Sequence, residues 1–227
     1  MLYIVSTPIG NPDDITLRAR RVLQAVALVV CEEYRAGSRV LRQCAVENKT
    51  LIELNEHNER ERTPEIVEHL KRGEDVALIS DHGTPLLADP GAELVKRALA
   101  ANIRVVPVPG ASSLLAALVV SGFPAQHFRF VGFLPAKKET RQRELEILKH
   151  DRDTLVLMDA PYRLNAVLED LAAAFGARQI VVACDLTMPG EFVERGTAEE
   201  VLARFRERKW KGEFVIMIAP KSLQRGG

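Results

Sequence analysis

The sequence predicts an α/β protein made of two domains. Short apolar runs rich in Val and Ile alternate along the chain with longer amphipathic stretches, the order typical of layered strands and helices. Gly122-Phe123-Pro124 interrupts this pattern near the middle. We therefore expect an N-terminal α/β domain at residues 1–121 and a C-terminal α/β domain at 122–227. With 227 residues, the chain is long enough for a sizeable core.

The composition argues against several classes of protein. The chain has 31 Lys and Arg against 31 Asp and Glu, so no overall field draws it to nucleic acid or anionic membrane. No apolar run approaches the roughly 20 residues that span a bilayer, and the first residues lack a signal-peptide pattern. The three cysteines and five histidines show no metal-ligand spacing. We expect a cytoplasmic protein with no membrane contact and no metal site.

The elements of the first half follow from apolar runs and helix-start signals. Four- to six-residue runs rich in β-branched residues predict strands at 2–6, 26–31, 50–54, 76–79 and 104–108. Apolar residues near 3.6 spacing predict a helix at 15–24, and a charged helix is expected at 38–44. Further helices are expected to begin at Thr63-Pro64, at Asp89-Pro90 (with Asp89 as N-cap and Pro90 at the first helical position) and at Ser113. We read the polar run at 55–62 as a solvated loop.

The second half repeats the alternation. Strands are expected at 128–133, 154–158, 180–184 and 214–218, and helices at 137–150, 162–175 and 199–209. The last residues, 221–227, are expected to be frayed.

The stretch from Ser80 to Gly91, S-D-H-G-T-P-L-L-A-D-P-G, has the features of a ligand-binding loop. It follows an expected buried strand, whose carboxyl end leaves backbone N–H groups free, and ligands of open α/β sheets bind there. Gly83 has no Cβ to hinder a ligand. Ser112 and Ser113, at a later helix N-terminus, offer hydroxyl and N–H groups to a polar or anionic ligand. The alternatives are an ordinary turn and a plain N-cap.

Several motifs together resemble one known family. They are T-P-I-G-N at 7–11, C-E-E-Y-R at 31–35, N-E-H-N-E at 55–59, the Ser80–Gly91 loop, P-V-P-G-A-S-S at 107–113, G-F-L-P at 132–135, E-R-G-T at 194–197 and K-G-E-F at 211–214. In this order they are similar to the tetrapyrrole methylase superfamily, and most similar to its members that methylate small-subunit ribosomal RNA. The resemblance implies two α/β domains with S-adenosylmethionine between them, and a homodimer. The RNA enzymes methylate a cytidine ribose 2′-hydroxyl, and the tetrapyrrole enzymes methylate ring carbons.

The resemblance also implies cofactor-binding positions. In the first domain they are Pro8, His82, Gly83, Thr84, Pro85, Leu87, Asp89, Ser112 and Ser113. In the second domain they are Met158, Ala160, Ala183, Gly212 and Glu213.

On the acceptor side the chain departs from the RNA-methylating members. It has E-Y-R-A-G at 33–37 for their D-T-R-x-T, D-A-P-Y-R at 159–163 for E-S-P-H-R, D-L-T-M at 185–188 for E-I-T-K, and His82 for an alanine. The acceptor therefore stays open between small-subunit ribosomal RNA and a tetrapyrrole or other small molecule. A non-catalytic protein that binds S-adenosylmethionine is the third alternative.

A ribose hydroxyl needs a base, and carboxylates at strand ends are the candidates. We expect Glu32 or Asp81 to serve, while Glu33 and Asp159 are similarly placed. Basic residues that could contact RNA phosphates fall in two groups: Lys137, Lys138, Arg141 and Arg143, and Arg204, Arg206, Arg208, Lys209, Trp210 and Lys211. The alternative for both groups is a solvated helix face.

Overall fold

The computed structural model describes residues 1–208 and 210–221, and the chain divides into two compact units. The first unit is Met1–Ser112, and the second begins at Ser113. The sequence places residues 113–121 in the first domain. They form helix α5 (Ser113–Ser121), which packs on strands β8 (Gln179–Cys184) and β10 (Phe214–Ile218) of the second unit.

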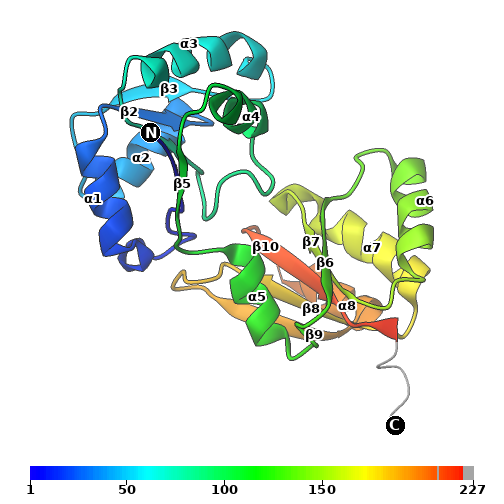
Figure 1. Ribbon diagram of the computed structural model, residues 1–227. Helices are drawn as coiled ribbons and strands as arrows, with labels where there is room; N and C mark the ends of the chain where they lie inside the picture. The colour runs from blue at the N-terminus through cyan, green and yellow to red at the C-terminus, as the bar shows by residue number, and fades with distance from the viewer. Residues whose placement is uncertain (209, 222–227) are drawn as a thin grey trace. The chain divides into compact units, whose positions relative to one another are not determined.

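The first unit is a five-stranded parallel sheet in the order β3-β2-β4-β1-β5 (Figure 1). Its strands are β1 (Leu2–Val5), β2 (Leu28–Cys31), β3 (Thr50–Glu53), β4 (Val76–Ile79) and β5 (Val105–Val108). Its helices are the short 3-10 helix η1 (Pro12–Asp14) and α1 (Leu17–Ala25), α2 (Tyr34–Gln43), α3 (Glu59–Lys71) and α4 (Ala92–Ala100).

Helices cover both faces of this sheet, which explains why β2 and β4 are apolar at every position. Ala77 and Ile79 pack with α1 and α2 in one core cluster. Val76 and Leu78 pack with α3 and α4 in the other. Because successive side chains of a strand point to opposite faces, both faces need apolar residues.

Helix α3 begins four residues earlier than the sequence predicts, so Pro64 lies inside it rather than in its first turn. The residues before it fold locally: Asn55 Oδ1 accepts from the Asn58 N–H at 3.1 Å, and the Glu59 N–H donates to the Asn55 carbonyl at 2.9 Å. This turn starts the helix upstream of the proline. The reading of 55–62 as a solvated loop is therefore wrong for its second half.

The second unit is a mixed five-stranded sheet in the order β6-β7-β10-β8-β9. Its further elements are β6 (Phe128–Phe133), α6 (Lys138–Leu148), β7 (Thr154–Met158), the 3-10 helix η2 (Pro161–Arg163), α7 (Leu164–Phe175), β9 (Phe192–Thr197) and α8 (Ala198–Glu207). One core cluster joins α6, α7 and α8 to one face of the sheet. Strand β9 is not predicted by the sequence, because F-V-E-R-G-T is only partly buried and has no apolar alternation.

Strand β6 contains a bulge that changes the direction of its last side chain. Phe130 pairs with Val156 and Gly132 with Leu157, so Val131 is an extra residue, and Gly132 has φ +76°. Without the bulge, Phe133 would point to the opposite face from Phe130. With it, both share one face of the sheet.

The α/β class is confirmed, and four strands, 76–79, 128–133, 154–158 and 214–218, have the predicted bounds. Of the expected frayed tail, only Lys221 lies within the described residues. No helix in the described part of the chain is long and apolar enough to cross a membrane.

Candidate active site

The loops after three neighbouring strands of the first sheet are hydrogen-bonded to one another. β1 lies between β4 and β5, so the segments that follow them meet at one edge. Thr7 Oγ1 donates to the Ser80 carbonyl at 3.0 Å, and the Gly83 N–H donates to Thr7 Oγ1 at 3.2 Å. Thr84 Oγ1 donates to the Ala111 carbonyl at 3.0 Å. These bonds fix the Ser80–Gly91 loop from two sides.

The loop holds three residues with positive φ: Gly83, Leu86 and Gly91. Gly83 has φ +84°, and a Cβ added there would lie 2.9 Å from the Ile9 side chain. A glycine is therefore needed at position 83 for its positive φ and for the space beside Ile9. The reason expected from the sequence is a different one, the approach of a ligand. Leu86, with φ +74°, is strained for a leucine. Such strain is found most often at functional sites, where the surrounding structure holds it in place.

The loop ends in a helix start that the sequence misplaces. Asp89 is not an N-cap; α4 begins at Ala92, and its N-cap is Gly91. The carboxylate of Glu59, the first residue of α3, accepts from the N–H groups of Gly91 at 2.9 Å and Glu93 at 3.1 Å. Sequence reasoning missed Glu59 because a cap from another helix leaves no local pattern.

Carboxylates gather at the same edge of the first sheet. Glu32 follows β2 and Asp81 follows its neighbour β4. Burial raises the pKa of Glu32, and the charges of Asp89 and Asp81 raise it further. Burial also raises the pKa of Asp81, against the lowering effect of His82. Within residues 1–208 and 210–221, the buried Asp81 Oδ1 has no hydrogen-bond partner.

The fold brings together the first-unit residues implied by the resemblance. Pro8 follows β1, Ser112 follows β5, and the loop after β4 carries the others: His82, Gly83, Thr84, Pro85, Leu87 and Asp89. His82 and Leu87 are exposed, whereas Pro8 and Pro85 are buried. Ser113 is the first residue of α5 and belongs to the second unit.

The implied residues of the second unit also share one sheet edge. Met158 at the end of β7 and Ala183 in β8 are both paired with Val215 of β10. Because β10 is antiparallel to both strands, the residues that precede it, Gly212 and Glu213, lie at the edge where β7 and β8 end. Ala160 is two residues beyond β7. The side chain of Ala183 is fully buried in the sheet.

Asp185 holds the turn before β10 in place. Its Oδ2 accepts from Trp210 Nε1 at 2.7 Å, and its Oδ1 accepts from the Glu213 N–H at 3.2 Å. The Asp185 N–H in turn donates to the Glu213 carbonyl at 2.8 Å. The backbone that precedes β10 is therefore anchored to the end of β8.

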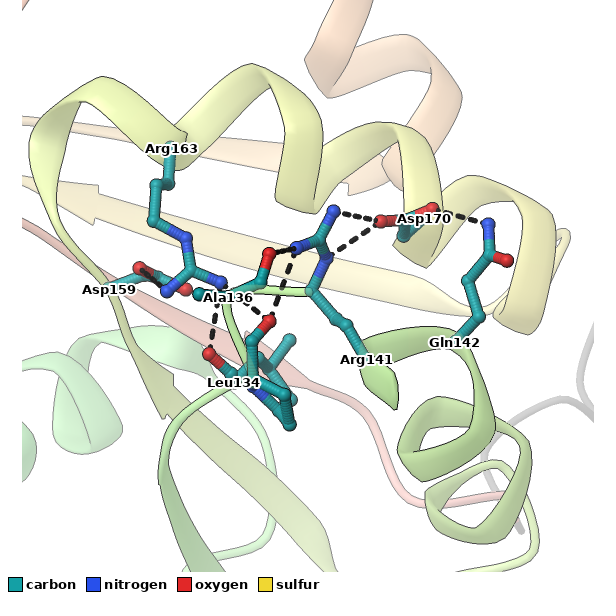
Figure 2. Close-up of polar contacts among 8 residues, drawn as sticks. Leu134, Ala136, Arg141, Gln142, Asp159, Arg163 and Asp170 are labelled. Atoms are coloured by element: carbon teal, nitrogen blue, oxygen red, sulfur yellow. Dashed lines mark hydrogen bonds and ion pairs between the residues drawn. The ribbon is translucent and has the colours of Figure 1, made fainter. Parts of the chain in front are cut away.

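A buried polar network fixes the loop after β6 (Figure 2). Arg163 pairs with Asp159 at 3.1 Å and donates to the carbonyls of Leu134 and Pro135, both at 2.9 Å. Arg141 pairs with Asp170 at 2.6 Å and donates to the carbonyls of Pro135 and Ala136 at 3.2 and 3.1 Å. Two guanidinium groups thus share the Pro135 carbonyl.

Only one carboxylate oxygen of Asp159 takes part in this network. Its Oδ1 accepts from the Ala160 N–H at 2.7 Å and pairs with Arg163, whereas the buried Oδ2 has no partner among the residues described. Burial raises the pKa of Asp159, although the Ala160 N–H and Arg163 lower it.

The structure excludes several residues of the two groups that the sequence predicts as RNA contacts, because their side chains are buried or already paired. Arg141 is buried and bound to Asp170, so its assignment as an RNA contact is wrong. In the second group, Arg204 and Arg208 both pair with Glu194, and Arg206 pairs with Glu169. Trp210 packs against Phe192 and Phe205. These four side chains therefore support the second unit itself. Lys209 lies outside the described residues.

The unpaired acceptors fit S-adenosylmethionine, which carries a positive sulfonium and the hydrogen-bond donors of an ammonium, hydroxyls and an amino group. Within the described residues, one buried carboxylate oxygen lacks a donor just beyond a strand of each sheet: Asp81 Oδ1 after β4 and Asp159 Oδ2 after β7. Buried acceptors are nearly always paired in native proteins, so both sites suit a donor from a ligand. Among the residues that the structure covers, no group of His, Cys, Asp and Glu could hold a metal ion.

Curated relatives resemble the chain over nearly its whole length. Ribosomal RNA small subunit methyltransferase I of Xylella fastidiosa is 44% identical over 220 residues, which are 96% of this chain and 80% of the relative. The protein with the same name from Micromonospora olivasterospora is 42% identical over 96% of this chain and 70% of its own. That of Escherichia coli O157:H7 is 40% identical over 98% and 79%.

Solved structures share the fold at lower identity. A cobalt precorrin-4 methyltransferase of cobalamin biosynthesis superposes with a TM-score of 0.69 at 17% identity, covering 96% of this chain and 94% of its own. Uroporphyrin-III C-methyltransferase from Thermus thermophilus gives 0.67 at 23% identity, covering 96% and 93%. Residues 1–202 match the family described as Tetrapyrrole (Corrin/Porphyrin) Methylases. The chain belongs to this family and is an S-adenosylmethionine-dependent methyltransferase.

Proposed function

We propose that the chain methylates a ribose 2′-hydroxyl of small-subunit ribosomal RNA. The observation that carries this proposal is the identity of 40–44%, over at least 96% of the chain, to relatives named for methylation of that RNA. The tetrapyrrole enzymes share the fold at 17–23% identity, which supports no shared acceptor. The altered residues at strand ends leave the carboxylates at those positions in place: Glu32, Asp81 and Asp159.

The proposed cofactor residues are the positions that the family resemblance implies. In the first unit they are Pro8, His82, Gly83, Thr84, Pro85, Leu87, Asp89 and Ser112. In the second they are Ser113, Met158, Ala160, Ala183, Gly212 and Glu213. Bound S-adenosylmethionine supplies an electrophilic methyl group. The chain's part is to orient the acceptor hydroxyl, exclude water and take up its proton.

Glu32 and Asp81 are the proposed proton acceptors. A base is most effective when its pKa is near the working pH, and burial moves both carboxyls in that direction. The charges that act on Glu32 are all carboxylates, which further disfavours its charged form. Around Asp81, His82 and Arg39 oppose the carboxylates Asp89 and Glu33. We expect Glu32→Gln together with Asp81→Asn to lower kcat by about 10²-fold or more, with the affinity for S-adenosylmethionine largely kept.

The test is transfer of labelled methyl from S-adenosylmethionine to three acceptors: small ribosomal subunits from cells lacking this protein, naked small-subunit RNA, and a tetrapyrrole precursor. We expect label that maps to a ribose in the ribosomal samples. Label confined to the tetrapyrrole, or no transfer by protein that binds S-adenosylmethionine, would reject the proposal. Turnover of the double variant within a few-fold of the parent would reject Glu32 and Asp81 as bases. The proposed methylation of RNA would still stand.

We also propose a homodimer. Helix α5 leaves Leu115, Val119 and Val120 exposed, which is an apolar face that a second copy would cover. Light scattering of the purified chain measures the mass directly, and a monomer at micromolar concentration would reject this proposal.

A further inference from the structure

Tyr162 is the most exposed large apolar or aromatic side chain in the described part of the molecule. It is 83% exposed, although it lies in η2, only two residues beyond the proposed cofactor residue Ala160. Phenol rings usually bury most of their surface. An aromatic ring this exposed, and this close in sequence to a proposed cofactor residue, is available to stack on a partner.

The backbone beside this ring is held firmly. Arg163, the next residue, is bound to Asp159 and to two carbonyls of the loop after β6, as Figure 2 shows. Arg141 holds the same loop from the other side. Tyr162 is thus presented from a backbone that the network fixes, which lowers the entropy lost when a partner binds to it.

The cationic side chains near Tyr162 in the sequence or in the fixed loop are of two kinds, those in ion pairs and those without one in the described part of the chain. Arg141 and Arg163 are neutralised by Asp170 and Asp159. Lys137 and Lys138, which follow the fixed loop, are exposed, and no ion pair with an acidic group is present for either within the described residues. Because Arg163 touches the carbonyls of this loop, the two lysines belong to the same sheet edge as Tyr162.

We propose that Tyr162 stacks on an unpaired base of the RNA substrate while Lys137 and Lys138 contact its phosphates. Single-stranded RNA is bound by this combination of an aromatic face and cationic groups along the backbone. The inference rests on the proposed function, and it adds which surface holds the RNA. It keeps Lys137 and Lys138 from the first predicted group and adds Tyr162, which the sequence did not single out. It excludes the arginines of α8, Arg204 and Arg206, because their charges are paired.

The test measures binding of a fluorescein-labelled single-stranded RNA of about 12 nucleotides by anisotropy, with S-adenosylhomocysteine in excess. We expect Tyr162→Ala to weaken binding about tenfold and Tyr162→Phe to restore most of it, because the phenyl ring can stack. Ile147→Ala is the matched control: Ile147 is an exposed apolar residue of α6 in the same unit, so its removal should leave the affinity unchanged.

The lysines are tested by the salt dependence of the same binding. Lys137→Ala together with Lys138→Ala should weaken binding and reduce the slope of log Kd against log salt by about 1.4, the value for two phosphate contacts on a single strand. The matched control is Lys96→Ala, an exposed lysine of α4. An unchanged slope would overturn the assignment of the lysines.

Methyl transfer into small ribosomal subunits separates the two proposals. We expect Tyr162→Ala to raise the KM for subunits while the Kd for S-adenosylmethionine stays as in the parent. If the parent labels ribose and Tyr162→Ala matches it in RNA affinity and KM, the inference fails and the proposed function stands. If the parent labels no RNA, the proposed function fails and the inference with it.

Discussion

Two adjacent acidic residues of α7 show how burial decides how much an ion pair contributes to the stability of the fold. Glu169 pairs with Arg206 at 2.5 Å, and Asp170 pairs with Arg141 at 2.6 Å. The Glu169 side chain is 51% exposed, whereas that of Asp170 is 4% exposed and also accepts from Gln142. Exposed pairs are weakened by water and salt, but removing one member of a buried pair leaves an uncompensated charge.

We therefore predict that Asp170→Ala lowers the free energy of unfolding by about 3–5 kcal/mol, because the Arg141 guanidinium loses its counter-ion in the protein interior. Glu169→Ala should lower it by less than about 1 kcal/mol. Urea unfolding of both variants measures the difference. Equal losses would show that Arg141 is balanced by its carbonyl contacts alone.

Asp81 should make stability depend on pH. Burial raises its pKa, so the folded chain binds this proton more tightly than the unfolded chain. The favourable contribution is full below the unfolded value of about 4 and is lost as pH rises through the raised folded value. Asp81→Asn cannot ionise. Its stability relative to the parent should therefore increase from pH 4 to pH 7 in urea unfolding, and a difference that stays constant over this range would contradict the prediction.

At the scale of elements, the cap of α4 links two helices that pack together. Glu59 belongs to α3, yet its carboxylate satisfies N–H groups at the start of α4. A carboxylate at a helix N-terminus also interacts favourably with the helix dipole. Since α4 follows the Ser80–Gly91 loop, this contact fixes the far end of the loop.

Glu59→Ala should consequently lower the free energy of unfolding by about 1 kcal/mol, the usual effect of losing an N-terminal cap. We also expect weaker binding of S-adenosylmethionine, because the loop loses one of its attachments. Calorimetric titration and urea unfolding measure the two effects. Glu61→Ala, in the same turn of α3, is the control, and an equal effect there would point to helix propensity instead of capping.

The elements predicted from the sequence are those whose position depends on residues within the element itself. The buried strand β4 is a continuous apolar run and β7 is apolar after Thr154, and the predicted bounds of both agree with the structure. Strand β9 and the start of α4 depend on partners distant in the sequence: β9 on its pairing with β8, and α4 on Glu59. Of the candidate site, local pattern predicts the Ser80–Gly91 loop and the Ser112-Ser113 pair, and the remaining positions come only from resemblance to a family. Their role in binding the cofactor stays a prediction. Their gathering at sheet edges follows from strand order, which no local pattern contains.

At the scale of the whole molecule, the chain has two units with separate cores, and the proposed cofactor residues come from both. A ligand that binds only the folded state stabilises every part that contributes to its site. The only tryptophan, Trp210, lies in the second unit, so its fluorescence reports unfolding there. Far-UV circular dichroism reports both units.

We predict that S-adenosylhomocysteine at 100 times its Kd stabilises the protein by about 2.7 kcal/mol and shifts both signals together in urea. A ligand-induced shift of the dichroism with an unchanged Trp210 transition would place the whole site in the first unit. The control is adenosine at the same concentration, which lacks the amino-acid portion.

The extra residue in β6 has a consequence beyond the direction of Phe133. β6 is an edge strand, and one side of it offers unpaired backbone groups to which a strand of another molecule could add. The irregularity at Val131 breaks the even spacing of those groups and twists the strand, which makes such growth unfavourable. Deletion of Val131 would restore a regular edge. We expect this deletion to lower solubility, because folded molecules would slowly associate into larger assemblies.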